Sequence, residues 1–351
     1  MQTHSRLPRS SSHVLLAALA AMPLSVQAAP TPAYEPVALI PFTAGQGSGV
    51  AMAINNQGVV CGMWPGPTGA FCWRDGTLTE LQPLPGDDNV YVQGINERGQ
   101  AVGGSQSTGS FRRRAVVFID GVAHEVPIPQ ATASTASGIN DAGDIVGAYT
   151  GRDGLNTAFL YRHGAVDELG TLGQTVRSSD AADINNRQQI VGNSLTDTPT
   201  GGGGFVTRAF LYQHGAMTAL PTRAGYGSIA AKVNERGTVV GRIENNDGSF
   251  DWRAALWEKG KLKVLVEQPS DARGINNRGQ VVGAVLSGSG GFFYEPGKPV
   301  RSLNDLIDTS TGWSIQYAQA INDRGQIVGF GCRNDLCGPV LMNPTGKRDD
   351  D

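Results

Sequence analysis

Short apolar runs alternate with turn residues along most of the chain. In the commonest unit, a run such as Ala136–Asn140 is followed by a turn that contains Gly143 and by a second apolar run, Ile145–Gly147. Two short apolar runs joined by an Asn-x-x-Gly turn predict a β-hairpin, and we name its strands a and b. A second hairpin follows in the unit, here Ala158–Tyr161 and Ala165–Leu169, and gives strands c and d.

This unit occurs seven times, with its asparagines 41 to 49 residues apart. They are Asn55, Asn96, Asn140, Asn185, Asn234, Asn276 and Asn322. A repeat of this length with four short strands predicts a β-propeller, in which each unit forms one blade. A β-helix ranks second, because its coils are usually shorter and contain fewer turns. No window beyond the N-terminal segment has the 3.6-residue apolar period of a helix, so the predicted class is all-β.

The two ends of the repeat region predict how the ring closes. The segment Tyr34–Phe42 has the pattern of a strand d, yet it precedes the first strand a. The seventh unit stops after its strand c, at Met342. Pairing these two segments removes two open sheet edges, which otherwise invite aggregation. We therefore expect a seven-bladed propeller with four antiparallel strands per blade, in which the N-terminal strand completes the last blade.

The N-terminus has the features of an export signal. Arg6 and Arg9 precede the apolar stretch Val14–Val26, and a small-x-small cleavage site ends at Ala28. The apolar stretch is too short for a membrane span, which takes about 20 residues. An N-terminal anchor that is retained is the alternative. We expect a secreted or periplasmic protein that consists of a signal peptide (1–28), one propeller domain (29–343) and a short polar tail (344–351).

The charge balance argues against nucleic acid as a partner. Without residues 1–28 the chain has 26 Lys and Arg against 31 Asp and Glu, whereas phosphate binding needs clustered cations. The one basic run, Arg112–Arg114, is interpreted as a solvated loop. Only His124, His163 and His214 remain after the signal, which is little material for a histidine-rich metal site. We predict a monomer without cofactor or metal.

The four cysteines form two local pairs, Cys61 with Cys72 and Cys332 with Cys337. An exported protein meets an oxidising compartment, where disulfides are the default. Four cysteines allow three pairings, and local pairing is favoured because each pair brackets one short connection. The rival interpretation of Cys332 and Cys337 is a zinc half-site, which lacks a second half-site and a nearby histidine.

Several stretches resemble one bacterial repeat family. They are Ala158–Tyr161, Leu169–Gly173, Asp183–Asn186, Leu303–Ile307, Gly312–Trp313 and Ala320–Asp323. Over residues 34–343 the chain resembles the HAF-type extracellular repeat family. It departs from that family at the histidine of the HAF triplet, where Arg114, Arg208 and Arg253 stand in three repeats. The resemblance implies export and a propeller-like fold, and it implies no agreed activity.

The strand order places the connections on two faces. The a–b and c–d turns lie on one face, the turn face, and the b–c and d–a loops lie on the other, the loop face. The turns are short and repetitive, and the repeated Asn is expected to start each a–b turn through its own side chain. The loops are individual, as in Thr196–Thr207 and Asp308–Tyr317. Because binding usually resides in variable loops on a rigid scaffold, we predict the loop face as the binding surface.

Aromatic and charged residues of the loops are the first candidate ligand contacts. Trp252, Trp313 and Tyr226 could stack on sugars or other flat apolar faces, with Asp251 nearby in sequence. Packing between blades is the alternative for the tryptophans. The segment Asn245–Asp251 offers oxygen ligands for calcium but does not fit an EF-hand loop.

Strand a contributes four further candidates, because it is otherwise lined with small residues. They are Asp183, Lys232, Arg273 and Gln319. Common catalytic motifs such as G-x-S-x-G and H-E-x-x-H are absent. We therefore predict a secreted, non-enzymatic module that binds an extracellular or envelope glycan or protein. The alternatives are a secreted hydrolase or lyase acting on polysaccharides or lactones, which would use these four residues, and a structural matrix component.

Overall fold

The computed structural model describes residues 1, 32–41, 49–110, 112–247, 249, 251–288 and 290–346. The expected signal peptide, apart from Met1, and the last five residues of the expected tail lie outside this part of the chain. No helix in the described part is long and apolar enough to cross a membrane. The compact unit that contains the repeats begins at Pro32.

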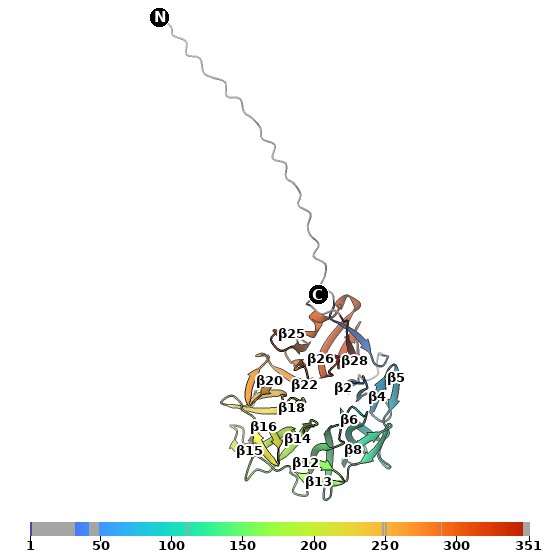
Figure 1. Ribbon diagram of the computed structural model, residues 1–351, viewed down its shortest axis with the longest axis vertical. Helices are drawn as coiled ribbons and strands as arrows, with labels where there is room; N and C mark the ends of the chain where they lie inside the picture. Colours follow the sequence, from blue (N-terminus) through green and yellow to red (C-terminus); the bar gives the residue numbers. More distant parts are fainter. Residues whose placement is uncertain are drawn as a thin grey trace. The chain divides into compact units, whose positions relative to one another are not determined.

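Seven four-stranded antiparallel sheets surround a common axis, which confirms the predicted propeller (Figure 1). Blades 1 to 3 consist of β2 (Val50–Ile54), β3 (Val60–Met63), β4 (Ala70–Arg74), β5 (Thr77–Glu80); β6 (Asn89–Ile95), β7 (Ala101–Gln106), β8 (Arg113–Ile119), β9 (Val122–Glu125); and β10 (Ala133–Ile139), β11 (Ile145–Thr150), β12 (Asn156–Arg162), β13 (Ala165–Glu168). Blades 4 to 6 consist of β14 (Ser179–Ile184), β15 (Ile190–Pro199), β16 (Phe205–Gln213), β17 (Ala216–Ala219); β18 (Tyr226–Val233), β19 (Val239–Asn245), β20 (Trp252–Glu258), β21 (Lys261–Val264); and β22 (Ser270–Ile275), β23 (Val281–Val285), β24 (Gly290–Tyr294), β25 (Arg301–Ser302). Strands a to d of each blade are hydrogen-bonded in chain order, with strand a next to the axis.

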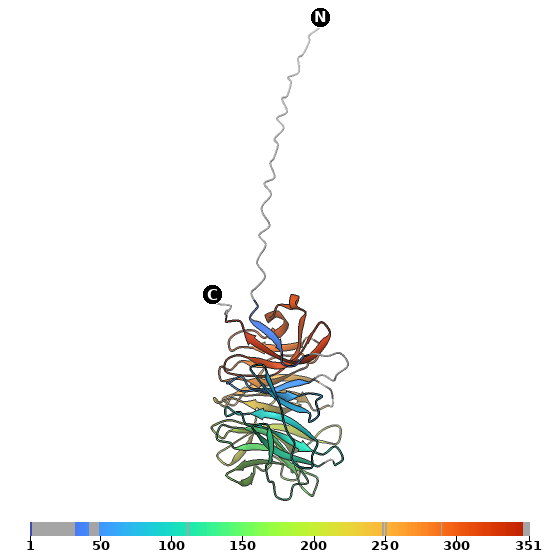
Figure 2. The same ribbon diagram turned by 90° about the vertical axis from the view of Figure 1, so that its right-hand side faces the viewer.

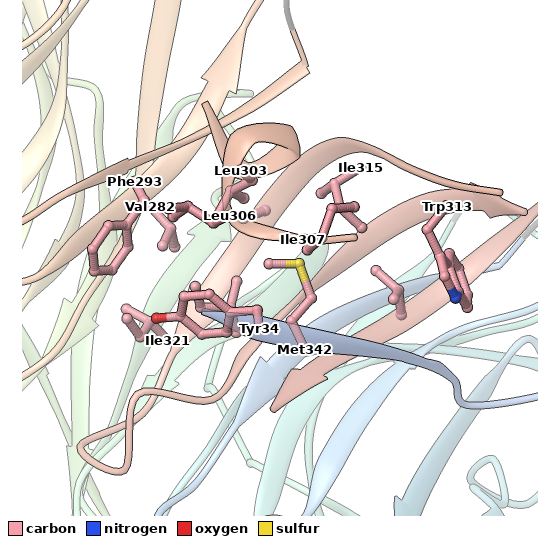
Figure 3. Close-up of a cluster of buried hydrophobic side chains, with 13 residues drawn as sticks. Tyr34, Val282, Phe293, Leu303, Leu306, Ile307, Trp313, Ile315, Ile321 and Met342 are labelled. Atoms are coloured by element: carbon pink, nitrogen blue, oxygen red, sulfur yellow. The ribbon is translucent and has the colours of Figure 1, made fainter. Parts of the chain in front are cut away.

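Blade 7 combines both ends of the repeat region, as predicted. It consists of β26 (Trp313–Ile321), β27 (Ile327–Arg333), β28 (Leu336–Pro344) and β1 (Tyr34–Ala38). β1 pairs antiparallel with β28 from Tyr34 opposite Pro344 to Ala38 opposite Val340, and the two lie side by side in Figure 2. Tyr34 packs in the core of this blade with Leu306, Ile307 and Met342 (Figure 3). Burial raises the pKa of the Tyr34 hydroxyl to about 12, so the closing strand is anchored by a neutral, largely buried ring.

Strand c supplies a fully buried aromatic ring at an inner position in each of the first six blades. The rings are Phe71, Phe118, Phe159, Phe210, Trp257 and Phe292, each no more than 1% exposed. Full burial of a side chain of this size stabilises the fold by roughly 2–3 kcal/mol. These rings pack with apolar residues of strands a and b, so hydrophobic cores lie between successive blades.

The a–b turns have the conformation that the repeated glycine predicts. Gly143, for example, has φ of 90°, and the exceptional Gln188 adopts φ of 59°. Glycine enters this left-handed region without steric cost, whereas other residues seldom do. The conformation of the turn is therefore kept even in the one blade that lacks the glycine.

Both predicted disulfides are present. Cys61 of β3 lies directly opposite Cys72 of β4, and Cys332 of β27 lies directly opposite Cys337 of β28. Each bond therefore joins strands b and c of one blade. The pairing agrees with an oxidising compartment.

Three local features differ from the sequence-based expectations. Arg113 and Arg114 begin β8 and do not form a solvated loop, because Arg114 is paired with carboxylates of the neighbouring segments. Strands β15 and β16 extend into the expected loop Thr196–Thr207 and leave only residues 200–204 as the connection. Two 3-10 helices, η1 (Leu303–Leu306) and η2 (Thr309–Thr311), replace most of strand d and the following loop in blade 6.

Candidate functional site

A β-bulge recurs at the same place in all seven innermost strands. In β22, for example, Ala272 pairs with Gly283 and Gly274 pairs with Val282, which leaves Arg273 as the extra residue. The seven bulge residues are Met52, Gln93, Ser137, Ala182, Ala231, Arg273 and Gln319. All seven line one cavity of about 410 Å³ on the axis, together with Lys232 and Asp271. Each bulge therefore aims one side chain at the channel, a common use of bulges at functional sites.

The wall of this channel is uneven. Blades 3 and 4 contribute the small residues Ser137 and Ala182, whereas Lys232, Asp271 and Arg273 of blades 5 and 6 are charged. The charged side chains that line the channel are thus concentrated on one side of the axis.

Five residues of blades 5 to 7 form a connected group that we call the arginine ladder: Trp252, Arg242, Asp271, Arg273 and Tyr317. The Arg242 guanidinium lies 4.2 Å from the centre of the Trp252 ring, and its Nη1 lies 3.5 Å from a carboxylate oxygen of Asp271. Asp271 also lies 3.5 Å from Nε of Arg273. The Arg273 guanidinium in turn lies 5.0 Å from the centre of the Tyr317 ring. The ladder therefore runs from strand c of blade 5 to the channel.

Neighbouring groups hold the ladder in place. Arg242 pairs with Glu244 at 3.2 Å, and Arg273 donates to the Gln319 side chain at 3.2 Å. The Tyr317 ring stacks on Phe330, with ring centres 5.3 Å apart. Guanidinium groups over aromatic faces are attracted by the ring quadrupole, so the arrangement presents rigid, partly buried cations and one carboxylate near the loop face.

A second polar cluster lies on the loop face around blade 5. The Tyr226 hydroxyl donates to Asp251 at 2.8 Å, and Arg253 pairs with both Asp251 at 2.9 Å and Glu267 at 2.7 Å. Arg223 pairs with Glu267 at 2.9 Å. Hydrogen bonds from Arg253 and Tyr226 lower the pKa of Asp251. Two arginines and two carboxylates balance each other here, so the cluster clamps the loops together.

Asp183 and Lys232 face each other across the channel end of blades 4 and 5. Their charged atoms are 3.4 Å apart, and Asp183 also accepts a hydrogen bond from the backbone of Val233 at 3.0 Å. This ion pair joins two blades, so the two predicted candidates bind each other.

The structure removes Trp313 from the set of exposed candidates. Its side chain is only 5% exposed and lies in the core of blade 7 (Figure 3). Packing between blades, the alternative considered for the tryptophans, describes Trp313, because its core cluster also contains Val282 and Phe293 of blade 6. Trp252 is half-buried and lies beside Arg242.

The sequence reasoning missed Arg242, Asp271 and Tyr317. A signal existed for Arg242, which directly follows the repeated glycine of strand b. The residues at this position are Met63, Gly104, Ala148, Asn193, Arg242, Ala284 and Phe330, and only Arg242 is charged. No comparable pattern shows that Tyr317 of β26 lies under Arg273 of β22, four strands earlier in the chain.

Exposed apolar side chains gather on the b–c connections of the loop face. Leu155, Phe205, Leu286 and Leu336, in blades 3, 4, 6 and 7, are 37–43% exposed. Among residues 32–346 that the structure describes, only three other large apolar side chains are as exposed. They are Val37, Ile119 and Val122. The loop face therefore carries apolar tips around a charged channel mouth.

The turn face is closed by a ring of hydrogen bonds between the repeated asparagines. Each side-chain amide donates to the backbone oxygen of the corresponding asparagine in the next blade, at 2.9–3.4 Å, and the last donor, Asn322, reaches Asn55. The side-chain oxygen of Asn55 also accepts from Gln57 and Val59 within its own turn. The predicted turn role is confirmed, and the ring between blades is an additional role.

A second ring follows from the residues after these asparagines. Each backbone N–H donates to the side chain of the equivalent residue in the next blade, at 2.7–3.0 Å. The members are Asn56, Glu97, Asp141, Asn186, Glu235, Asn277 and Asp323. These seven residues surround a cavity of about 270 Å³. The carboxylates among them accept hydrogen bonds from backbone N–H groups of the neighbouring blades. In the described chain, no three His, Cys, Asp or Glu side chains are arranged to hold a metal ion.

The fold is similar to solved propellers of low sequence identity. A catalytically inactive histidine-to-alanine variant of virginiamycin B lyase from Staphylococcus aureus with quinupristin has a TM-score of 0.53 and 13% identity, covering 88% of this chain and 99% of that chain. YCF48 bound to D1 peptide has a TM-score of 0.50 and 10% identity, covering 92% of this chain and 98% of that chain. No family model and no curated protein matches the chain. At these identities the similarity establishes the propeller fold alone.

Proposed function

We propose that the chain is an exported, non-enzymatic propeller that binds a glycan or protein of the envelope or extracellular space on its loop face. The contrast between the two faces carries this proposal. Repeated polar residues of the turn face bond to each other in two closed rings, whereas the loop face combines the arginine ladder with four exposed apolar tips. Aromatic rings beside fixed charges suit a polar ligand with flat apolar surfaces.

The state of the candidate catalytic residues supports binding over catalysis. Asp183 is paired with Lys232, and Arg273 is held by Asp271 and Gln319. Among the described residues, these candidates are therefore engaged with partners of the chain itself, and Asp183 is not placed as an unpaired base beside the channel. The lyase with a similar fold is inactive in a histidine variant. In the present chain, His163 and His214 lie in c–d turns and His124 lies on an outer strand, so none of these three lines the channel.

The direct test is a glycan array probed with the mature protein, residues 29–351, next to the Trp252→Ala variant. We expect binding to a defined group of glycans and at least a tenfold loss in the variant, in line with stacking contacts of a few kcal/mol. Protein partners are tested in parallel by cross-linking on the surface of producing cells. A blank array, no partner and no activity on polysaccharides would favour the structural matrix interpretation.

One observation favours the enzyme alternative. Asp180 occupies the position in β14 that Asp271 occupies in β22, between a buried serine and a buried alanine of the innermost strand. Burial raises the pKa of Asp180, and the Asn156 amide that donates to it at 3.0 Å opposes this only in part. A carboxyl group whose pKa is raised is better suited to act as a general acid toward a glycoside or lactone. Turnover of such substrates that is lost in Asp180→Asn would establish the hydrolase or lyase.

A further inference from the structure

Three arginines stand at the same place in three blades. Arg114, Arg208 and Arg253 each precede a buried alanine at the start of strand c. In each case the carbonyl of that alanine accepts a hydrogen bond from the residue eleven positions further along, at 2.8–2.9 Å. The three side chains therefore leave equivalent backbone positions on the loop face, and their surroundings can be compared directly.

Two of these arginines are neutralised by carboxylates of the chain itself. Arg114 lies 2.8 Å from Asp87 and 3.2 Å from Glu125. Arg253 lies 2.9 Å from Asp251 and 2.7 Å from Glu267. The position can thus accommodate two carboxylates around one guanidinium, one on each of its terminal nitrogens.

Arg208 has no carboxylate partner among the described residues. Its Nη2 donates to the backbone oxygen of Leu220 at 2.7 Å. Its Nε, like that of Arg253, is buried without a hydrogen-bond partner, so the difference between the two arginines lies in their carboxylate partners. Burial lowers the pKa of Arg208, and no carboxylate acts against this effect. By the same spacing that places Asp251 and Glu267 beside Arg253, blade 4 has Val206 and Thr222. A half-buried cation without counter-charge is costly unless an anion from outside completes the site.

We propose that Arg208 binds a carboxylate of the ligand, and that the ligand is a glycan containing an acidic sugar. This inference rests on the proposed function and adds the ligand class. The neighbouring cations Arg223 and Arg253 are already paired with Asp251 and Glu267, so the loop face offers one uncompensated cation there. The chain without its expected signal is net negative, which disfavours acidic peptides and other densely charged polyanions. A sugar chain with isolated carboxylates fits one such cation beside aromatic and apolar contacts.

The matched variants are Thr222→Glu and Thr222→Gln. Both lose the hydrogen bond from the Thr222 hydroxyl to the backbone of Gly227. Only Thr222→Glu places a carboxylate where Glu267 stands in blade 5, and it should occupy Arg208 from within the chain. Arg208→Gln removes the cation itself and provides an independent second variant.

The experiment titrates glucuronate, glucose, acetate and N-acetylglutamate amide into the mature protein and its variants, and follows the melting temperature and the Arg208 Nε–H resonance. We expect glucuronate to raise the melting temperature and shift that resonance in wild type and Thr222→Gln, with at least a tenfold loss of affinity in Thr222→Glu and Arg208→Gln. Glucose should have no effect on the resonance.

Three outcomes would overturn the inference. Equal responses of Thr222→Glu and Thr222→Gln would show that Arg208 does not hold the carboxylate. Equal responses to acetate or N-acetylglutamate amide and to glucuronate would exclude an acidic sugar as the specific ligand. A glycan-array signal that persists unchanged in Thr222→Glu would leave the proposed function intact and remove Arg208 from it, whereas a blank array would count against the proposed function itself.

Discussion

The two ends of the propeller channel are built on different principles. At the turn face each blade contributes the same asparagine, and every side chain bonds to the next blade until Asn322 returns to Asn55. At the loop face the equivalent positions differ from blade to blade, and the charged and aromatic residues gather in blades 5 to 7. Sevenfold repetition thus marks the part that holds the blades together, and departure from repetition marks the part that can distinguish ligands.

The two faces also differ in how completely their polar groups are hydrogen-bonded. The amides of the turn-face ring are 3–4% exposed and fully engaged within the chain. On the loop face, Arg208 keeps a buried Nε without a partner. A satisfied ring offers little to a ligand, whereas an incompletely satisfied cation does.

The largest expected effect comes from opening the ring. Deleting residues 32–41 removes β1 and the buried Tyr34 and leaves the edge of β28 unpaired. Because this strand pairing and the burial of Tyr34 are both lost, we expect a loss of more than about 5 kcal/mol of unfolding free energy. Urea unfolding measures it.

A second variant does the opposite and links β1 to β28 covalently through an engineered disulfide. Glu35 and Asn343 are directly opposite each other in β1 and β28, so a cysteine pair at these positions should raise the melting temperature. An unchanged unfolding curve after the deletion would contradict the closure model.

A smaller but still large effect is expected for a single asparagine of the turn-face ring. Asn234→Ala removes hydrogen bonds from Arg236 and Thr238 and the bond to the backbone of Asn276, all at 3.0 Å. Loss of these buried partners should cost about 3 kcal/mol, measured by chemical denaturation. Ligand affinity should stay unchanged. A variant that binds poorly while remaining stable would place function on the turn face and break the comparison.

The smallest effects concern carboxylates of the two faces, whose pKa values shift in opposite directions. Burial and then the charges of Asp141 and Asp323 raise the pKa of Glu97 on the turn face, and hydrogen bonds lower that of Asp251 on the loop face. The stability linked to Glu97 is present in acid and is lost as the pH rises through its raised pKa. The stability linked to Asp251 is present near neutrality and is lost as the pH falls through its lowered pKa.

Glu97→Gln should therefore be slightly more stable than wild type near neutral pH, by a fraction of a kcal/mol, because Glu97 is only half-buried and the hydrogen bond from Asn56 opposes part of the effect of burial. Asp251→Asn should be less stable near neutral pH. Both differences should vanish in strong acid, as melting temperatures across a pH series will show. Parallel pH profiles of the two variants would refute the assigned directions.

Blade number, ring closure, turn conformation and disulfide pairing could be predicted because each depends on local pattern repeated many times. The spacing of Asn140 and Gly143 identifies a turn, and the same spacing recurs in other blades. The unpaired segment around Tyr34 finds a strand partner only near the C-terminal end of the chain. The burial of Trp313 was not predictable, since the core to which it belongs also includes residues of η1 and of β1, the latter from the opposite end of the chain.

The arginine ladder also escaped prediction for a physical reason. The recurrent bulge turns Arg273 into the channel, but its partners Asp271, Tyr317 and Gln319 come together only when blades 6 and 7 pack side by side. A one-residue change of register would place these side chains on the opposite face of the strand. Sequence spacing identified Arg273 and Gln319 as unusual without revealing that they touch.

The most direct test of the contrast between faces compares the same substitution at both ends of one hairpin. Arg236 is exposed in the a–b turn of blade 5, and Arg242 belongs to the arginine ladder on the following strand. The measurement is the dissociation constant of Arg242→Gln and Arg236→Gln for the strongest ligand of the wild-type glycan array. The account predicts at least a tenfold weaker complex for Arg242→Gln and wild-type affinity for Arg236→Gln. Loss of affinity in Arg236→Gln with full binding by Arg242→Gln would contradict it.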